Sequence, residues 1–387
     1  MNIFNSLGSN YNLSYLFRAL FHRGTDQDAK KLKTLLEEQY NGEAVLLYKG
    51  REALSMALKI LNFSQDSQVA INGFTCVAVF NAIRTAGYDP VYLDLEKTRG
   101  LNFTSQTLEK EIKRNRKIKV VVVQNTLGYP CEITEIQKIC KKNNIVLIED
   151  LAHCVGTKYN TGEEAGTVGD FVILSFSQDK IIDAVSGGAL VVRNKKYTGR
   201  LDEFHLKNSQ WKLKDKLYPF ITYKIRLLYP FGFGKLYHFL VKKFGLLSNI
   251  MDESFYNFYK LPNWNAMLAW NEFHNLDKNL THRKNVAKLY TSLLPDSIFM
   301  FNKKTTYEIV SLSSNLRFPI FLDNRSGLIK SLKKQGVFVS DIWYTDVAPE
   351  CPNAVGDAKI IVNLPTHRNV TKKDALHISQ IITSCLK

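Results

Sequence analysis

Strand-length apolar runs alternate with amphipathic segments of helix length along the first half of the chain, and this alternation constrains the fold more than any other feature. Parallel strands need crossover connections of this kind, usually helices. The sequence therefore predicts an α/β fold, with a three-layer large domain whose mostly parallel sheet is covered by helices on both faces. We expect strands at residues 44–48, 69–71, 90–93, 118–124, 145–148, 171–176 and 189–192, and intervening helices at 29–38, 53–61, 75–85, 107–113 and 133–141.

A second, smaller domain follows from the length of 387 residues and from a change of pattern. Helical periodicity returns at residues 265–294, and Pro295 ends that predicted helix. We assign residues 1–265 to an N-terminal lead and the large domain, with a basic, aromatic excursion at about 200–257. Residues 266–387 form a connecting helix and a small C-terminal α+β domain.

The net charge of +16 indicates an anionic partner. No zinc-finger spacing or RRM-like aromatic signature accompanies the charge, so we expect no nucleic-acid partner. Residues 213–244 interleave Lys and Arg with Tyr, Phe and Leu. This segment allows a weak contact with an anionic membrane surface, or a helical excursion packed on the protein with its lysine charges in water. We favour the second interpretation because Pro219, Pro230, Gly232 and Gly234 interrupt the segment.

The six cysteines are scattered, without a CxxC pair or a metal-site spacing. This pattern favours reduced thiols and predicts no metal site. The N-terminus lacks a signal-peptide pattern, and no apolar run is long enough to span a bilayer. We therefore expect a cytoplasmic protein, at most peripheral to a membrane.

Polar residues stand where predicted strands end, which is where open α/β sheets bind ligands. Asp150 follows the run at 145–148, and Ser175 and Lys180 lie at the end of the next one. Each also has a purely structural interpretation: Asp150 as a cap, Ser175 as a small core residue and Lys180 as a surface lysine. Together they predict a cofactor site, with Lys180 as the candidate for a Schiff base. Gly50 and Arg51 open a helix, either as a phosphate site or only as a turn.

The order of these residues resembles the DegT–StrS family of sugar aminotransferases, which are fold-type I pyridoxal phosphate (PLP) enzymes. The family pattern appears as DLAH at residues 150–153, SFSQDK at residues 175–180 and a glycine pair at 187–188. Weaker matches at 48–96, 128–130, 259–277 and 363–367 extend the resemblance over most of the chain. The Asp–Ser–Lys set is specific, and the other matches support it.

The resemblance implies a role for each residue of this set. Lys180 would hold PLP covalently and move a proton between the substrate carbon and the cofactor. Asp150 would pair with the pyridine nitrogen, and His153 would bond near the ring's O3′. Ser175 and the backbone at Gly50 and Arg51 would hold the phosphate.

The sequence departs from the family pattern at three places. Cys76 stands where the family has an aromatic residue that stacks on the cofactor ring, and Arg51 replaces a small hydroxyl residue. In related enzymes the partner subunit of a homodimer closes the site with a segment that aligns near 257–260. This alignment gives Asn257 and Lys260 as candidate shared-site residues, although the family's asparagine itself aligns with Phe258. Tyr344 and His367 are candidate substrate or partner-subunit contacts.

The resemblance implies an aminotransferase that moves an amino group from an amino acid, glutamate in our prediction, to a keto group of a nucleotide-activated deoxysugar. Such a reaction serves the biosynthesis of cell-surface polysaccharide or a related glycan. One alternative is a dehydratase or eliminase on the same fold, but such relatives commonly carry histidine in place of Lys180. The other is a non-catalytic, membrane-associated binding module.

Overall fold

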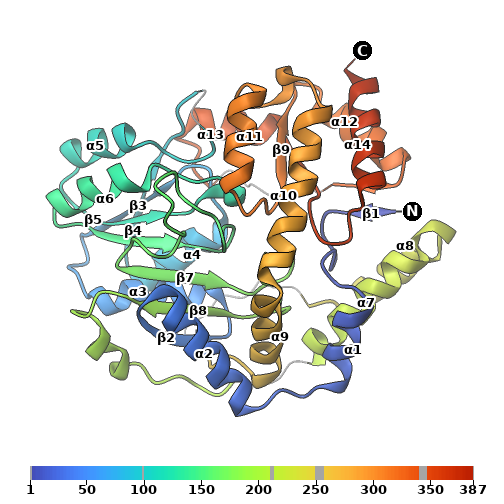
Figure 1. Cartoon of the computed structure of the whole chain (residues 1–387). Coiled ribbons are helices and arrows are strands. Elements are labelled where there is room, and N and C mark those ends of the chain that lie inside the picture. The colour runs from blue at the N-terminus through green and yellow to red at the C-terminus, as the bar shows by residue number, and fades with distance from the viewer. Residues whose placement is uncertain (1, 98–99, 210–212, 249–256, 340–346, 387) are drawn as a thin grey trace.

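A seven-stranded sheet forms the centre of the molecule, in the order β2–β8–β7–β6–β5–β3–β4 (Figure 1). The computed structural model describes residues 2–97, 100–209, 213–248, 257–339 and 347–386. All neighbouring strands in this sheet are parallel except β8, which is antiparallel to both β2 and β7. The strands are β2 (Glu43–Leu47), β3 (Gln68–Asn72), β4 (Asp89–Leu93), β5 (Ile118–Val123), β6 (Val146–Asp150), β7 (Phe171–Ser175) and β8 (Gly188–Val192).

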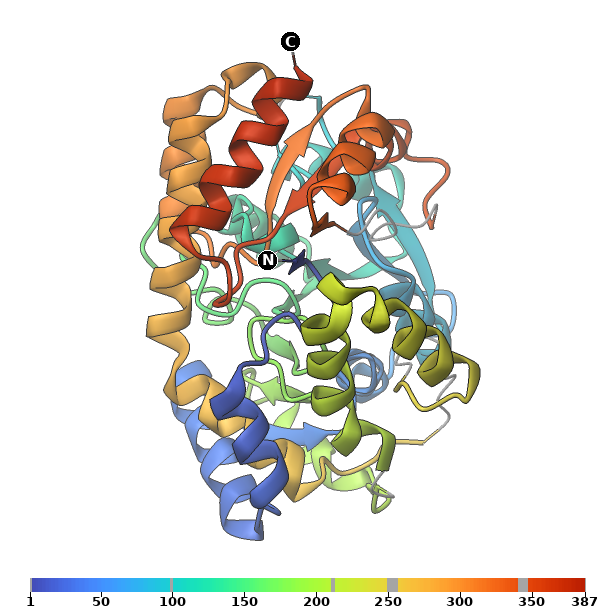
Figure 2. The same cartoon turned by 90° about the vertical axis from the view of Figure 1, so that its right-hand side faces the viewer.

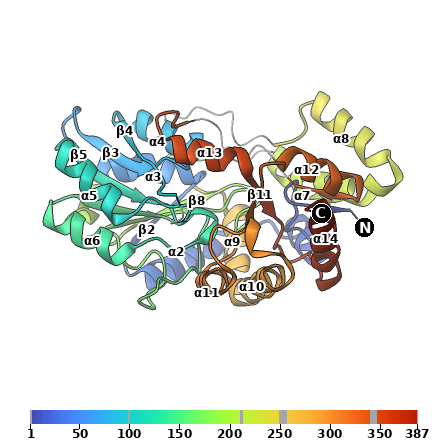
Figure 3. The same ribbon diagram turned by 90° about the horizontal axis from the view of Figure 1, so that it is seen from above.

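Helices cover both faces of this sheet because its strands bury side chains on both sides. In β5, Val121 and Val123 join one hydrophobic cluster, whereas Val120 and Val122 join another. The first cluster includes α2 (Asp26–Tyr40), α5 (Ser105–Arg114), α6 (Ile133–Lys142) and α9 (Asn263–His274), and the second includes α3 (Gly50–Leu61) and α4 (Val77–Ala86). Figure 3 shows these layers from above. The predicted three-layer α/β architecture is confirmed.

The C-terminal part builds its own core around the antiparallel pair β9 (Phe318–Phe321) and β11 (Ile361–Leu364). The helices of this part are α10 (Leu276–Leu293), α11 (Lys303–Leu312), α12 (Arg325–Lys334), α13 (Pro352–Ile360) and α14 (Lys372–Cys385). Its short strand β10 (Val337–Phe338) pairs in parallel with β1 (Ile3–Phe4), so the start of the chain attaches here (Figure 2). The domain division at residue 265 stays a prediction.

Three details differ from the sequence-based expectations. The helix expected over 265–294 is two helices, α9 and α10, which meet at Asn275. Neither Pro219 nor Gly234 interrupts the basic segment: α7 (Leu213–Leu228) continues through Pro219, although a proline removes one helical N–H, and Gly234 lies inside the next helix. The break comes later, at Tyr229–Phe231 and Gly232 (φ +79°), before α8 (Phe233–Lys243). No helix in the described ranges is long and apolar enough to cross a membrane.

Candidate active site

The site lies where the parallel strands end. β2, β5, β6 and β7 run in the same direction, so their carboxyl ends meet at one edge of the sheet. Asp150 is the last residue of β6, Ser175 is the last residue of β7, and Lys180 lies in the loop between β7 and β8. The topology therefore brings together residues that the sequence separates by up to 30 positions.

The two neighbouring acids of β6 have different surroundings. Glu149 is fully buried and accepts four hydrogen bonds: from the Tyr159 hydroxyl (2.8 Å) and from the backbone N–H groups of Gly166 (2.8 Å), Val168 (2.8 Å) and Gly169 (2.6 Å). Asp150 accepts from the Ala152 N–H at 2.9 Å. Burial raises the pKa of Asp150, and the Ala152 N–H and the Lys180 ammonium oppose that rise. Glu149 thus supports the fold, and Asp150 is the acid next to Lys180.

Lys180 is half-buried and lies in a mixed electrostatic environment. Burial lowers the pKa of its amine, while Cys76 and Asp150 act in the opposite direction. Burial also holds the pKa of His153 well below its ordinary value, and the charges of Lys180 and Arg317 add to this effect. The Nδ1 atom of His153 accepts from the Leu127 N–H at 3.4 Å, so this imidazole is neutral at pH 7. An amine with a lowered pKa is a better nucleophile and base at neutral pH than an exposed lysine.

The first turn of α3 reaches the same edge, and only glycine permits the approach. A Cβ atom added to Gly50 would lie 2.8 Å from the Cβ of Ser175, and one added to Gly188 would lie 2.5 Å from the Gly50 nitrogen. The first turn of α3, with the positive end of the helix dipole, therefore lies against Ser175. Arg51 is half-buried in this first turn. The arrangement fits a phosphate group.

Cys76 lies at the start of α4, where its Sγ atom accepts from the Ala78 N–H at 3.4 Å. Next to it, the Thr75 hydroxyl donates to Oε1 of Gln124 at 2.5 Å. Gln124 directly follows β5 and is buried, but the sequence analysis did not select it. Its position after a strand is the signal that could have identified it.

The segment near Asn257 and Lys260 pairs with this subunit's own β2. The Tyr48 N–H donates to the Tyr259 carbonyl at 2.9 Å, and the Tyr259 N–H donates to Glu52 at 3.1 Å. The Lys260 N–H donates to the Lys207 carbonyl at 2.9 Å, and its side chain is exposed, whereas Asn257 is half-buried. The segment thus lies beside the first turns of α3 of its own chain.

His367 is buried on the side of the C-terminal core. Its Nε2 atom donates to the Phe4 carbonyl at 2.8 Å, and its Nδ1 atom accepts from the Asn369 N–H at 3.3 Å. Burial, followed by the charges of Arg317 and Arg283, holds its pKa well below the ordinary value. Both ring nitrogens therefore bind the backbone. Tyr344 lies outside the described residues.

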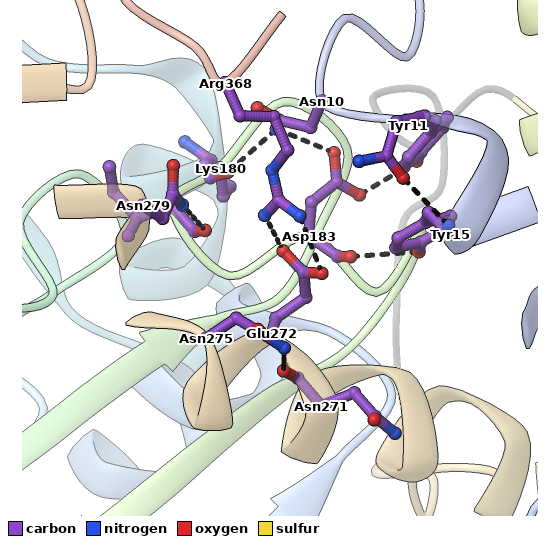
Figure 4. Close-up of polar contacts among 12 residues, drawn as sticks. Asn10, Tyr11, Tyr15, Lys180, Asp183, Asn271, Glu272, Asn275, Asn279 and Arg368 are labelled. Atoms are coloured by element: carbon purple, nitrogen blue, oxygen red, sulfur yellow. Dashed lines mark hydrogen bonds and ion pairs between the residues drawn. The ribbon is translucent and has the colours of Figure 1, made fainter. Parts of the chain in front are cut away.

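A feature that the sequence analysis missed is the contact between the N-terminal lead and the Lys180 loop (Figure 4). The Asn10 amide donates to the Lys180 carbonyl at 3.0 Å and to Oδ2 of Asp183 at 3.1 Å. The Tyr11 hydroxyl donates to Oδ1 of Asp183 at 2.8 Å, and the Tyr15 hydroxyl donates to its carbonyl at 2.9 Å. Burial, with the nearby Asp179 carboxylate, raises the pKa of Asp183 to about 7.

Comparison with known proteins identifies the family and supports the fold. Residues 29–383 match the DegT/DnrJ/EryC1/StrS aminotransferase family. The chain is 26% identical over 303 residues to a GDP-perosamine synthase of Vibrio cholerae (78% of this chain, 72% of the relative). It is 27% identical over 361 residues to a UDP-4-amino-4,6-dideoxy-N-acetyl-beta-L-altrosamine transaminase of Campylobacter jejuni (89% and 85%). Spr1654 of Streptococcus pneumoniae, solved in a PMP form, has a similar fold (TM-score 0.71, 17% identity, 96% and 95% coverage), and its PLP form is also known.

The chain belongs to the DegT/DnrJ/EryC1/StrS aminotransferase family. It is an aminotransferase, and pyridoxal phosphate is its cofactor. The predictions of the family, the fold, the enzyme class and the cofactor are therefore confirmed. The roles of the individual site residues stay predictions.

Proposed function

We propose that this enzyme transfers an amino group from glutamate to a keto group of a nucleotide-activated deoxysugar, for the biosynthesis of a cell-surface polysaccharide or a related glycan. The Vibrio cholerae and Campylobacter jejuni relatives are named for GDP-linked and UDP-linked amino sugars. A net charge of +16 favours a substrate that carries a diphosphate. The observation that carries the proposal is that the buried Asp150 and His153 and the half-buried Lys180 lie together at the strand ends, beside the first turn of α3.

These residues fit pyridoxal phosphate. The cofactor, when bound, withdraws electrons from the substrate carbon next to the nitrogen. The Lys180 amine, with its lowered pKa, takes a proton from that carbon or returns one. The Asp150 carboxylate accepts a hydrogen bond from the ring nitrogen and keeps it protonated. Ser175 and the N–H groups at Gly50 and Arg51 bind the phosphate.

The neutral imidazole of His153 hydrogen-bonds the oxygen substituent of the ring without adding a second charge beside Lys180. The half-buried position of Lys180 also limits the access of water, which would compete with the amine for protons. Cys76 contributes a small side chain toward the site, in place of the aromatic residue usual in the family.

Two features of the assembly belong to the same proposal. The enzyme works as a homodimer, in which the segment containing Asn257 and Lys260 also contacts the partner's site; the exposed Lys260 side chain supports this. The reaction takes place in the cytoplasm, which is supported by the six cysteines, all of them free. Light scattering of the purified enzyme measures the mass of the assembly, and a monomer would contradict the dimer.

The first experiment tests the chemistry of Lys180. We expect the purified enzyme to be yellow, and borohydride reduction to attach the cofactor permanently to the peptide that contains Lys180. Lys180→Ala should lose this attachment, whereas Lys195→Ala, at an exposed lysine, should retain it. A wild-type enzyme that carries no reducible cofactor would contradict the assigned role of Lys180.

The second experiment identifies the substrates. Candidate keto-sugar nucleotides are incubated with glutamate, and the products are identified by mass. We expect an amino-sugar nucleotide and 2-oxoglutarate in equal amounts. A sugar that loses oxygen without gaining nitrogen would indicate a dehydratase instead, and turnover with other amino acids only would exclude glutamate as the donor.

A further inference from the structure

Three helices that are distant in the sequence form one outer surface of the molecule. α1 (Leu13–Phe21), α7 and α8 lie on the same side (Figures 1 and 2). Residues next to α1 contact α7: the Arg226 guanidinium donates to the Tyr11 carbonyl at 2.9 Å, and the Tyr11 and Tyr218 rings meet edge to face, 6.2 Å apart. α7 and α8 pack against each other through a small buried cluster that includes Ile225 and Val241. We call α1, α7 and α8 together the outer surface.

Much of the apolar side of this surface faces solvent. On α8, Phe233, Leu236, Phe239 and Leu240 follow helical spacing on one face, and each is between 39% and 66% exposed. Large exposed side chains also occur on α1 and beside α8: Leu13, Phe17, Leu20, Phe21, Phe231 and Phe244, each between 40% and 72% exposed. An amphipathic helix in a globular protein normally turns such a face toward the core. An exposed apolar surface of this kind indicates a binding partner.

The same surface carries positive charge, and the one acid within its three helices, Asp215 of α7, is buried. No Asp or Glu occurs in residues 1–25 or in residues 216–251. The two segments contain Arg18, Arg23, Lys216, Lys224, Arg226, Lys235, Lys242 and Lys243. Lys235, Lys242 and Lys243 of α8 are exposed as well, and helical spacing puts Lys243 on the same face as Phe239 and Leu240. Two independent segments thus bring the same combination of aromatic, aliphatic and basic side chains to one side of the fold.

We propose that the outer surface binds an anionic phospholipid bilayer. The Phe and Leu side chains enter the region between the headgroups, and the lysines contact the lipid phosphates. Lipid fits the surface better than a second copy of the chain. In a two-fold dimer a patch meets its own copy, so these cations would face one another without acids to offset them. The contact is peripheral, as expected of helices that lie along the interface. It does not depend on the proposed substrate.

Vesicle flotation of the full-length enzyme tests the proposal. The vesicles contain phosphatidylcholine alone or phosphatidylcholine with phosphatidylglycerol. We expect the enzyme to float only with the anionic vesicles, and to release as the salt concentration rises. The triple variant Lys235→Glu, Lys242→Glu, Lys243→Glu should weaken binding about a hundredfold or more. The double variant Leu236→Ser, Phe239→Ser should abolish flotation while leaving thermal unfolding and aminotransferase activity unchanged.

A matched control tests whether vesicle binding depends on this surface or only on the net charge of the protein. Lys330→Glu, Lys333→Glu, Lys334→Glu on α12 makes the same change of charge at three exposed lysines elsewhere, and should bind vesicles nearly as well as wild type. An equal loss of vesicle binding in the two triple variants would overturn the proposal. So would an enzyme that floats only with neutral vesicles, or one that floats with neither kind. A lipid-free enzyme whose dimer dissociates in Leu236→Ser, Phe239→Ser would assign the surface to a second copy instead.

Discussion

Asn10 offers the sharpest test of how the Lys180 loop is held. Its amide donates to the Lys180 carbonyl and to Asp183 (Figure 4). Its Oδ1 atom accepts from the Arg283 guanidinium at 2.9 Å. Asn10 and Arg283 are 1% and 0% exposed, so water cannot replace these bonds without a rearrangement. Asn10→Ala removes all three bonds and leaves the surrounding groups in place.

The size of the effect follows from which partners keep other bonds. Asp183 still accepts from the Asp179 N–H (2.8 Å) and from the Tyr11 hydroxyl. Arg283 still donates to oxygen atoms of Asn279, Leu316 and Thr366. The Lys180 carbonyl and one guanidinium N–H lose the Asn10 bond. An unsatisfied buried group costs about 1–3 kcal/mol, so we expect Asn10→Ala to lower the free energy of unfolding by about 3 kcal/mol.

Loosening this loop should also affect the chemistry of Lys180. Burial lowers the pKa of the Lys180 amine, so the partial entry of water should raise that pKa toward its ordinary value. The rate at which pyridoxal phosphate attaches to the cofactor-free enzyme depends on the neutral amine. Its pH profile should therefore move to higher pH in Asn10→Ala.

Urea unfolding and this pH profile are measured together, with Asn12→Ala as the control. The Asn12 side chain accepts from the Tyr15 N–H at 2.9 Å as the N-cap of α1, so its loss should cost about 1 kcal/mol and leave the profile unmoved. If Asn10→Ala behaves like Asn12→Ala in both measurements, the lead does not position Lys180, and the reasoning is refuted.

Two further predictions concern the first turns of α3. Burial raises the pKa of Glu52 from 4.5 to about 7, so the folded enzyme binds this proton more tightly than the unfolded chain, and the resulting stability is lost as the pH rises from about 4.5 through 7. Between pH 5 and pH 8 the free energy of unfolding of wild type should therefore fall by on the order of 3 kcal/mol more than that of Glu52→Gln. The variant Glu43→Gln, at an exposed position, should follow wild type. Gly50→Ala places a Cβ 2.8 Å from Ser175, so it should lower the free energy of unfolding by about 1–3 kcal/mol and weaken cofactor binding. Its control is Gly356→Ala, which should be neutral or stabilising because the added Cβ meets nothing within 4 Å.

The strands and helices of the large domain were predictable because their signals are local. β5 buries Val120 to Val123 on alternate faces, and such β-branched runs identify a central strand by themselves. The edge that holds Asp150 and Ser175 was predictable as well, because parallel strands place their carboxyl ends together. β1, α11 and α13 were missed: β1 has two residues, and its pairing with β10 joins positions more than 330 residues apart.

The orientation of the basic segment could not be predicted for a different reason. Helical spacing in α8 shows that Leu236, Phe239 and Leu240 share a face, but periodicity does not say whether that face meets the core or solvent. The answer depends on α7, which presents Ile225 to Val241 on the other side of α8. The sequence also could not predict which of the neighbouring acids Glu149 and Asp150 supports the fold. That depends on which carboxylate accepts from the N–H groups of residues 166–169, and these come from a later loop.

The N-terminal lead connects these parts of the molecule. Within its first 21 residues, β1 pairs with the C-terminal core, Asn10 binds the Lys180 loop, and α1 packs beside α7. The bond from Asn10 to the Lys180 carbonyl spans 170 positions, so closing it costs more chain entropy than a local contact does. The position of Lys180 therefore depends on the completed fold and not only on the strand that precedes it. The amine has its surroundings, and with them its lowered pKa, only when the N-terminal lead is in place, so the reactive lysine depends on the finished structure.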